Sequence, residues 1–391
     1  MKNHSNKLNN VIYKLGFNLR PLLVIKKVVK SLLACEMIFR DQISYYPPQV
    51  TKLEKAFKSL TGKKYALTFC NGTSSLEAAI FAINTRFGKR KTIVVPSMNF
   101  HADLDAIINA GYKIKFIDVS ENSVVPSLSE VAEAVDDDTA CVILCHLFGH
   151  HIETAKIAEF LSARNVTFIE DCSHAHCSNA NNNVAKYCDI AFFSMQGAKA
   201  VAAGEGGVCV TNEKEFFVRM SAYSHFGRHD DMFSNELSEL TGTGIGHKHR
   251  MAPIGAVFAL TDIKFLRLQN KIIEINTTKL VNIIGKNVNV KVIDSEIGAT
   301  GRFGGLPILI GDIKKLAKIK CILDEYGIDY SDYPYLLHHN LCRYNGNLLG
   351  KFPNTENFAK AGLLLNRRYL EFLPFFQKIQ FTKAFGKIGN L

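Results

Sequence analysis

The sequence predicts an α/β protein: a three-layer, mostly parallel sheet in a large domain, followed by a smaller C-terminal α/β domain. Short β-branched runs alternate with amphipathic helical patterns between about residues 65 and 211. Such alternation is typical of a parallel sheet covered on both faces. After about residue 250 the order changes to one long helical stretch and two short strand patterns. With 391 residues, the chain is also long enough to hold a second domain.

The expected elements of the large domain follow from these patterns in order. Strands are predicted at 65–69, 92–95, 113–119, 140–147, 166–170, 190–194 and 207–211. Helices are predicted between most of them, at 74–83, 102–110, 127–135 and 154–164. Gly111 ends the second helix, and Ser127 with Glu130 has the spacing of a capping box at the start of the third.

Three segments are expected along the chain: a basic N-terminal extension at 1–40, the large domain at 41–250, and a linking helix with the small domain at 251–391. In the last segment we expect a long helix at 253–284, strands at 290–294 and 306–310, and a helix at 312–326. A final helix near 356–365 should lead to a basic, Phe-rich tail.

The net charge of +11 is concentrated in the extension, where residues 1–40 contain eight Lys or Arg and one acidic residue, Glu36. Nucleic-acid binders spread such charge over the main domain with aromatics between, so we expect no nucleic-acid partner. Residues 11–39 read as a helix covering the body with its lysines in solvent; the alternative is weak contact with an anionic membrane surface or a partner helix. The segment lacks a signal-peptide pattern, and no window is apolar enough to span a membrane, so we expect a cytoplasmic protein.

The residues that follow the strands suggest a ligand site, because ligands of open parallel sheets bind at the carboxyl ends of the strands. The first strand runs through Asn71, Gly72 and Thr73 directly into a helix. Free N–H groups and hydroxyls at a helix N-terminus suit a phosphate group. An ordinary turn with a serine cap and no ligand has the same sequence pattern.

Two further strand ends hold an acid and a lysine. Asp171 follows the strand at 166–170, where a buried carboxylate needs a cation or strong donor. Lys199 stands in a small-residue loop before Gly204-Glu205-Gly206-Gly207, a setting suited to a Schiff-base lysine. A phosphate cradle, an acid for a pyridinium nitrogen and an imine-forming lysine are the groups that pyridoxal 5'-phosphate requires.

Six segments of the sequence, in the order in which they follow one another, resemble the DegT/DnrJ/EryC1/StrS family of sugar aminotransferases. Members of this family have the fold-type I architecture and depend on pyridoxal phosphate. The resemblance spans about residues 45–370. The matching segments are 65–76, Val95-Pro-Ser-Met-Asn-Phe100, His146-Leu-Phe-Gly149, Ile169-Glu-Asp-Cys-Ser-His-Ala-His176, Phe193 through Lys199 to Gly207, and Gly246-His-Lys-His-Arg-Met251.

The resemblance implies a role for each matching residue. Lys199 would bind the cofactor as an imine and shuttle a proton, and Asp171 would pair with the pyridine nitrogen. The other cofactor positions are Phe100, stacked on the ring; Gly72, Thr73 and Ser194, at the phosphate; and His174, near the ring hydroxyl where the family usually has glutamine. The family also implies a homodimer with shared active sites, in which Lys248 replaces an asparagine that reaches the partner's phosphate.

The implied reaction moves an amino group from glutamate or glutamine to a keto-sugar, carried on a nucleotide or a phosphate, for a polysaccharide or a secondary metabolite. Gln196-Gly197-Ala198 departs from the family's usual His-Pro-Thr before the lysine. Two alternatives stay open. One is a sensor or scaffold that binds the cofactor or a sugar without turnover; the other is a pyridoxal-phosphate-dependent sugar dehydratase, which resembles the family but has histidine in place of the lysine.

The cysteines do not have the regular spacing of a disulfide framework, and most lie in apolar runs typical of buried strands. We therefore expect reduced core thiols. Asp171, Cys172, His174, His176 and Cys177 form a tempting metal cluster, but neither a Cys-x-x-Cys nor a paired His motif accompanies them. We expect no metal site.

Overall fold

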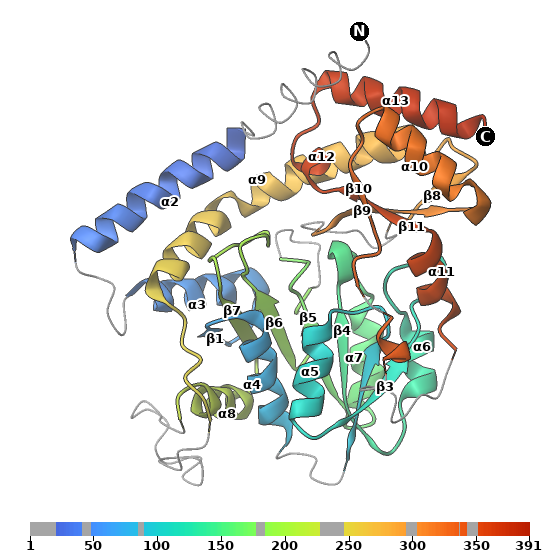
Figure 1. The fold of residues 1–391 in the computed structure, drawn as a ribbon. Helices are drawn as coiled ribbons and strands as arrows, with labels where there is room; N and C mark the ends of the chain where they lie inside the picture. The colour runs from blue at the N-terminus through green and yellow to red at the C-terminus, as the bar shows by residue number, and fades with distance from the viewer. Residues whose placement is uncertain are drawn as a thin grey trace.

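The structure is a computed structural model that describes residues 21–40, 48–84, 90–176, 184–226, 246–294, 303–335, 337–341 and 351–391. A large α/β part and a smaller α/β part are joined by the long helix α9 (Pro253–Ile284), drawn in yellow in Figure 1. Residues 11–20 of the expected leading helix, Cys177 and Cys342 lie outside the described residues. The domain boundaries at residues 41 and 251 stay predictions.

The large part is built on a seven-stranded sheet in the order β1-β7-β6-β5-β4-β2-β3. Its strands are β1 (Tyr65–Phe69), β2 (Thr92–Pro96), β3 (Lys113–Ile117), β4 (Thr139–Cys145), β5 (Thr167–Asp171), β6 (Ile190–Ser194) and β7 (Gly207–Thr211). β7 runs antiparallel to β1 and β6, and the other pairs are parallel. The mostly parallel sheet is confirmed, and the third and fourth strands end two residues earlier than expected.

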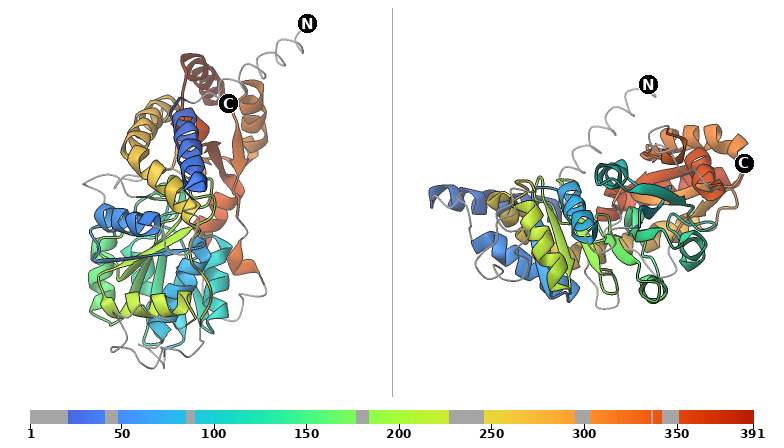
Figure 2. Two further views of the ribbon diagram at one scale, coloured as in Figure 1. Left: turned by 90° about the vertical axis from the view of Figure 1, so that its left-hand side faces the viewer. Right: turned by 90° about the horizontal axis from the view of Figure 1, so that it is seen from below.

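Helices cover both faces of this sheet (Figure 2). The helices of the large part are α3 (Pro48–Thr61), α4 (Gly72–Asn84), α5 (His101–Asn109), α6 (Leu128–Ala134), α7 (Thr154–Ser162) and α8 (Lys214–Ser224). Strand β4 shows the reason: Val142 and Leu144 pack in one apolar cluster, with α3, α6 and α7, while Cys141 and Ile143 pack in the other, with α4, α5 and α8. The capping box of Ser127 at α6 is confirmed.

The small part has an antiparallel four-stranded sheet in the order β10-β11-β9-β8. Its elements are β8 (Val290–Val292), β9 (Gly305–Ile310), α10 (Leu316–Glu325), β10 (Tyr330–Asp332), α11 (Pro353–Ala361), β11 (Gly362–Asn366), α12 (Arg368–Glu371) and α13 (Phe375–Gly389). Short 3-10 turns lie at Leu147–Gly149, Ile313–Lys315 and His338–Asn340.

The helix expected near 356–365 is wrong in its second half. α11 ends at Ala361, and residues 362–366 form strand β11. Leu363 and Leu365 enter the core of the small part, while the alternate residue, Leu364, packs in a cluster of the large part. This period of two belongs to a strand. The basic tail is also helical, as α12 and α13.

The described part of the N-terminal extension is helix α2 (Pro21–Phe39), which packs beside α9 (Figure 1). The expectation that its lysines lie in solvent is wrong for two of them. Lys26 is buried, and both Lys26 and Lys30 form ion pairs with Asp262 of α9. Among the described residues, no helix has the length and hydropathy needed to cross a membrane.

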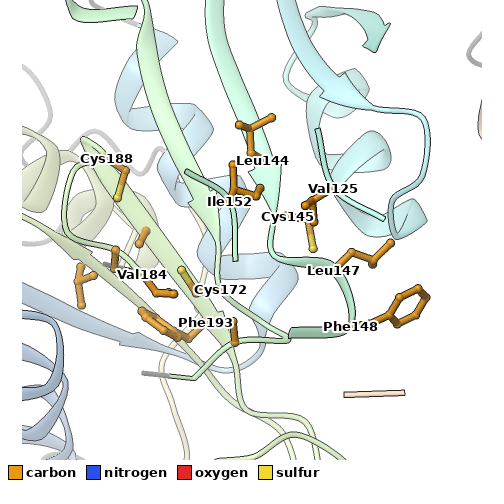
Figure 3. Packing of buried hydrophobic residues seen from close by; sticks show 14 of the residues in the cluster. Val125, Leu144, Cys145, Leu147, Phe148, Ile152, Cys172, Val184, Cys188 and Phe193 are labelled. Atoms are coloured by element: carbon orange, nitrogen blue, oxygen red, sulfur yellow. The ribbon is translucent and has the colours of Figure 1, made fainter. Parts of the chain in front are cut away.

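The buried cysteines pack as core side chains. Cys141, Cys145, Cys172, Cys188 and Cys209 are buried free thiols, and Figure 3 shows Cys145, Cys172 and Cys188 among side chains such as Phe193 and Leu144. Burial raises the pKa values of the Cys141, Cys145, Cys188 and Cys209 thiols, which keeps them protonated. Within the described ranges every cysteine is a free thiol, but Cys35 and Cys321 are exposed and so are not core residues.

Candidate active site

A helix N-terminus and a strand end meet at the carboxyl edge of the large sheet. α4 begins at Gly72, shortly after β1, and Ser194 ends β6. A Cβ atom at position 72 would lie 2.6 Å from the Ser194 Cβ, so only glycine allows this approach. Gly207, the first residue of β7, is equally crowded, because its Cβ would overlap the Ser75 hydroxyl. Gly72 and Gly207, which both lie in the matching segments, are thus required by packing.

The same junction has the features of an anion site. Asn71 caps the helix, since its Oδ1 accepts the Ser74 N–H at 2.7 Å. The N–H groups of the first turn, including those of Gly72 and Thr73, have no intrahelical acceptor, and the helix dipole adds positive potential there. Thr73 is exposed, and the Ser194 hydroxyl borders Gly72. A phosphate group fits this set of donors.

Asp171 is the last residue of β5 and is buried, with 4% of its surface exposed. Its Oδ1 accepts the Ser173 N–H at 2.8 Å. A buried carboxylate at the sheet edge is costly unless a cation or a proton donor meets it. The arrangement therefore suits a protonated ring nitrogen.

Lys199 stands in the loop of residues 195–206 between β6 and β7, here called the lysine loop. Burial lowers the Lys199 pKa below its ordinary value, although the negative charge of Asp171 opposes the shift. The Lys199 Nζ lies 3.9 Å from the centroid of the Phe303 ring. A lowered pKa makes the unprotonated amine more abundant at neutral pH, as a nucleophile or base requires.

The lysine loop has Gln196-Gly197-Ala198 where the family usually has His-Pro-Thr, and hydrogen bonds stabilise it there. Gln196 Oε1 accepts the Ala198 N–H at 2.8 Å, and the Lys199 N–H donates to the Gln196 carbonyl at 2.8 Å. The Arg367 Nη1 donates to the Ala198 carbonyl at 2.9 Å. Gln196 thus gives local support that the sequence pattern alone did not reveal.

His174 is buried with an assignable tautomer. Its Nδ1 accepts the Phe148 N–H at 3.1 Å, so the proton of the neutral ring resides on Nε2. Phe148 has a φ of 51°, in the left-handed region that aromatic residues rarely adopt, and this conformation belongs to the turn that aims its N–H at His174. Burial lowers the His174 pKa well below its ordinary value, so the ring is a neutral donor.

Phe100 precedes α5 at the mouth of the site, with 39% of its surface exposed. Its N–H donates to its neighbour Asn99 at Oδ1 over 2.7 Å. The ring centroid lies 5.9 Å from that of Tyr335, edge to face. An exposed aromatic face at this position is available to a planar ligand.

Lys248 stands apart from the other predicted residues. Its backbone pairs with His225, and the adjacent His249 carbonyl accepts the Cys70 N–H at 2.7 Å, so the segment runs beside the end of β1. The Lys248 side chain is exposed. Within the described ranges, no hydrogen bond or ion pair joins it to the other seven predicted residues.

Sequence reasoning missed several residues that border the site. Asp103, in the first turn of α5, is buried beside Asp171. Phe303 and Tyr335 come from the small part; the Phe303 ring centroid lies 4.3 Å from that of His174. Burial raises the Tyr335 pKa, which keeps its phenol protonated. These residues reach the sheet edge only through folding, and no local pattern marks them.

Among the described residues, the potential ligand atoms that lie close enough to share an ion are not those of the cluster around Asp171 but those of a partly different trio. Ligand atoms of His146, Glu170 and Cys172 lie within 4.8 Å of one another. The Ile152 N–H donates to His146 Nδ1 at 3.2 Å, so His146 Nε2 donates to Glu170 Oε2 at 2.9 Å. The trio reads as a buried hydrogen-bond network, and we assign no metal to it.

Comparison with protein families finds one match across most of the chain. The model of the DegT/DnrJ/EryC1/StrS aminotransferase family matches residues 30–368. Among curated proteins, GDP-perosamine synthase of Escherichia coli O157:H7 is 29% identical over 218 residues, which are 55% of this chain and 57% of the relative. The chain spans little more than half the length of the first curated relatives it matches, such as this one.

Solved structures share the fold at lower identity. Helicobacter pylori PseC, an aminotransferase involved in the biosynthesis of pseudoaminic acid, superposes with a TM-score of 0.79 at 19% identity, over 93% of this chain and 96% of that one. The GDP-4-keto-6-deoxy-D-mannose-3-dehydratase of E. coli, with bound hydrated PLP, gives 0.78 at 17% identity, over 91% and 96%. These likenesses confirm the fold-type I architecture.

Proposed function

We propose, because the chain belongs to the DegT/DnrJ/EryC1/StrS aminotransferase family, that it transfers an amino group from glutamate or glutamine to a keto-sugar with pyridoxal 5'-phosphate. The observation that supports this most is the meeting of three groups at one sheet edge: the anion site at Gly72, buried Asp171, and Lys199 with its lowered pKa. The cofactor supplies an aldehyde that condenses with amines and a ring that accepts electrons.

The residues present fit this cofactor. The first turn of α4 and Ser194 would bind its phosphate, and Asp171 would accept a hydrogen bond from its protonated ring nitrogen. His174 would donate its Nε2 proton to the ring hydroxyl oxygen, because Nδ1 already accepts from Phe148. Phe100 would cover one face of the ring. The tautomer of His174 thus leaves a donor free for the cofactor.

Lys199 would perform the proton transfers. Its amine is the nucleophile that holds the cofactor, and once released it can take a proton at Nζ and return it to a neighbouring carbon. This exchange needs a pKa nearer neutrality than that of a solvent-exposed lysine, and burial acts in that direction. A dehydratase with histidine in this position would lack the nucleophile, so Lys199 favours aminotransfer.

The acceptor, the assembly and the location are parts of the same proposal. GDP-perosamine synthase is named for a nucleotide-linked amino sugar, and we extend a nucleotide-sugar acceptor to this chain on that similarity. We further propose a cytoplasmic homodimer in which Lys248 reaches the cofactor phosphate of the partner. Lys248→Ala should then weaken cofactor binding, since an exposed ammonium near a phosphate adds affinity; unchanged affinity contradicts that contact.

Absorption spectra of the purified protein, before and after glutamate, test the reaction. Wild type should show a visible band of lysine-bound cofactor that glutamate converts to a shorter-wavelength band. Lys199→Ala should not show the band of lysine-bound cofactor, and it should not form this band after glutamate is added. A wild type without the band after cofactor addition contradicts the cofactor assignment. A band that neither glutamate nor glutamine shifts would favour the sensor, which the unusual Gln196-Gly197-Ala198 motif suggests.

A further inference from the structure

Helix α2 is joined to α9 by a buried ionic contact. Lys26 Nζ lies 2.8 Å from Asp262 Oδ1, and Lys30 Nζ lies 2.7 Å from Asp262 Oδ2. Asp262 is 1% exposed and Lys26 is 7% exposed. Lys26 also donates to Gln269 Oε1 at 2.8 Å. We call Lys26, Lys30 and Asp262 the α2 clamp.

The same carboxylate holds the lysine loop. Asp262 Oδ2 accepts the Ala202 N–H at 2.9 Å, and Lys30 donates to the Ala202 carbonyl at 3.2 Å. Both polar groups of the Ala202 backbone are therefore bound by the clamp. Ala202 lies three residues after Lys199. On the other side of the lysine, Arg367 holds the Ala198 carbonyl.

A buried ion pair is part of the docking of α2. Among the α2 residues whose burial is described, only Lys26 and Met37 are buried, whereas Val24, Ile25, Val28, Leu32 and Ile38 are exposed. An ammonium group is withdrawn from water only where a partner compensates, and burial lowers the Lys26 pKa here. Removal of the lysines would leave a buried carboxylate unpaired, so the contact fixes helix and loop together.

The clamp also forms one wall of a cavity. A space of about 810 Å³ lies between α2, α9 and the start of α12, and Lys199, Lys26 and Arg367 are among its lining residues. α2 therefore borders the surroundings of Lys199, although Lys26 precedes the part of the chain that the family model matches, residues 30–368.

We propose that Lys26, Lys30 and Asp262 are positioning residues that fix the lysine loop, and that the N-terminal helix is part of the active-site framework. The inference rests on the proposed role of Lys199. It also gives the basic extension a function inside the protein: two of its charges neutralise and orient a carboxylate that holds the Ala202 backbone.

Hydrogen exchange on the full-length, cofactor-free protein tests the clamp without any reaction. In Lys26→Met/Lys30→Met, the amides of residues 199–203 should exchange about tenfold faster than in wild type, because α2 no longer shields and orders them. Lys27→Met is the matched control, since Lys27 is exposed on the same helix, and its exchange should equal that of wild type. Unchanged exchange in the double variant overturns the proposal.

If the double variant does not fold, Lys26→Met/Lys30→Met/Asp262→Asn replaces it, because this triple change leaves no unpaired buried charge. The same increase in the exchange rate of residues 199–203 is expected, and an unchanged rate would again contradict the proposal.

A second readout separates positioning from stability. In cofactor-loaded protein, the pH titration of the visible band should shift by about half a unit or more in the clamp variant and stay constant in Lys27→Met. A lower unfolding temperature alone would not move this titration, so an unshifted titration contradicts positioning. A wild type that lacks the band would refute the proposed function instead, while the exchange result would still decide the clamp.

Discussion

Asp103 and Asp171 form a pair of buried carboxyl groups at the base of the site, in which the charge of Asp171 adds to burial in raising the Asp103 pKa well above its usual value of 3.8. Asn99 Nδ2 donates to Asp103 Oδ2 at 3.1 Å. Two neighbouring acids whose environments differ in this way divide their roles: one stays neutral and the other can hold a cation.

This pair predicts a pH-dependent effect of Asp103→Asn. Between pH 3.8 and the raised folded pKa, folded Asp103 binds more proton than the unfolded chain does. Its contribution to stability is therefore complete below that window and is lost as pH rises through it. Asp103→Asn cannot lose a proton in this way. Its free energy of unfolding should therefore rise relative to that of wild type by on the order of 1 kcal/mol for each pH unit within the window.

Urea denaturation of the cofactor-free protein from pH 4 to pH 8 measures the difference. Asp137→Asn is the control, because Asp137 is exposed, and its effect should be nearly constant with pH. A constant difference for Asp103→Asn as well would show that Asp103 titrates normally.

The contact between Gly72 and Ser194 predicts a cost for Gly72→Ala. The new Cβ would lie 2.6 Å from the Ser194 Cβ and 3.1 Å from its Cα, so the backbone of β6 or α4 must move. Overpacking of this kind typically costs about 1–3 kcal/mol. Since both segments border the anion site, cofactor affinity should fall as well.

Gly386→Ala, in α13, is the matched control for the same chemical change. Nothing lies within 4 Å of its added Cβ, and alanine favours a helix over glycine. Its unfolding free energy should equal or exceed that of wild type. If chemical denaturation finds equal stability for the two variants, the close approach at Gly72 is not as tight as described.

The strands of the large sheet could be predicted because buried parallel strands are short apolar runs with clear ends. The segment 362–366 could not be: Gly-Leu-Leu-Leu-Asn is too short for periodicity to separate strand from helix, and the decision lies in packing, with Leu364 opposite Leu363 and Leu365.

Most of the predicted site residues stand at strand ends or in the loops that follow, where the topology of a parallel sheet by itself favours a ligand-binding role. Topology does not mark Asp103, Tyr335 and Arg367 in this way. Asp103 lies on helix α5, and the other two belong to the small part. The α2 clamp was hidden for the same reason: Lys30 and Asp262 are 232 residues apart, and the leading lysines have the pattern of a solvated face.

His176 predicts how the protein responds to acid. The side chain is 1% exposed and lies against Phe193, with ring centroids 5.6 Å apart. Burial, with the positive charge of Lys199, lowers the His176 pKa from 6.5 to about 3. Below pH 6.5 the histidine is therefore protonated in the unfolded chain but stays neutral in the folded protein. The free energy of unfolding falls with falling pH until about pH 3.

His176→Phe should remove this part of the acid sensitivity. A fixed packing cost would lower its unfolding free energy equally at every pH, but the loss between pH 6 and pH 5 should be about 1 kcal/mol smaller than that of wild type. His101→Gln, at an exposed histidine, should keep the wild-type slope. Since His174 is also held neutral by burial, some acid sensitivity must persist in His176→Phe. Parallel profiles for wild type and His176→Phe would mean that His176 is protonated in the folded state, which would place a second positive charge beside Lys199.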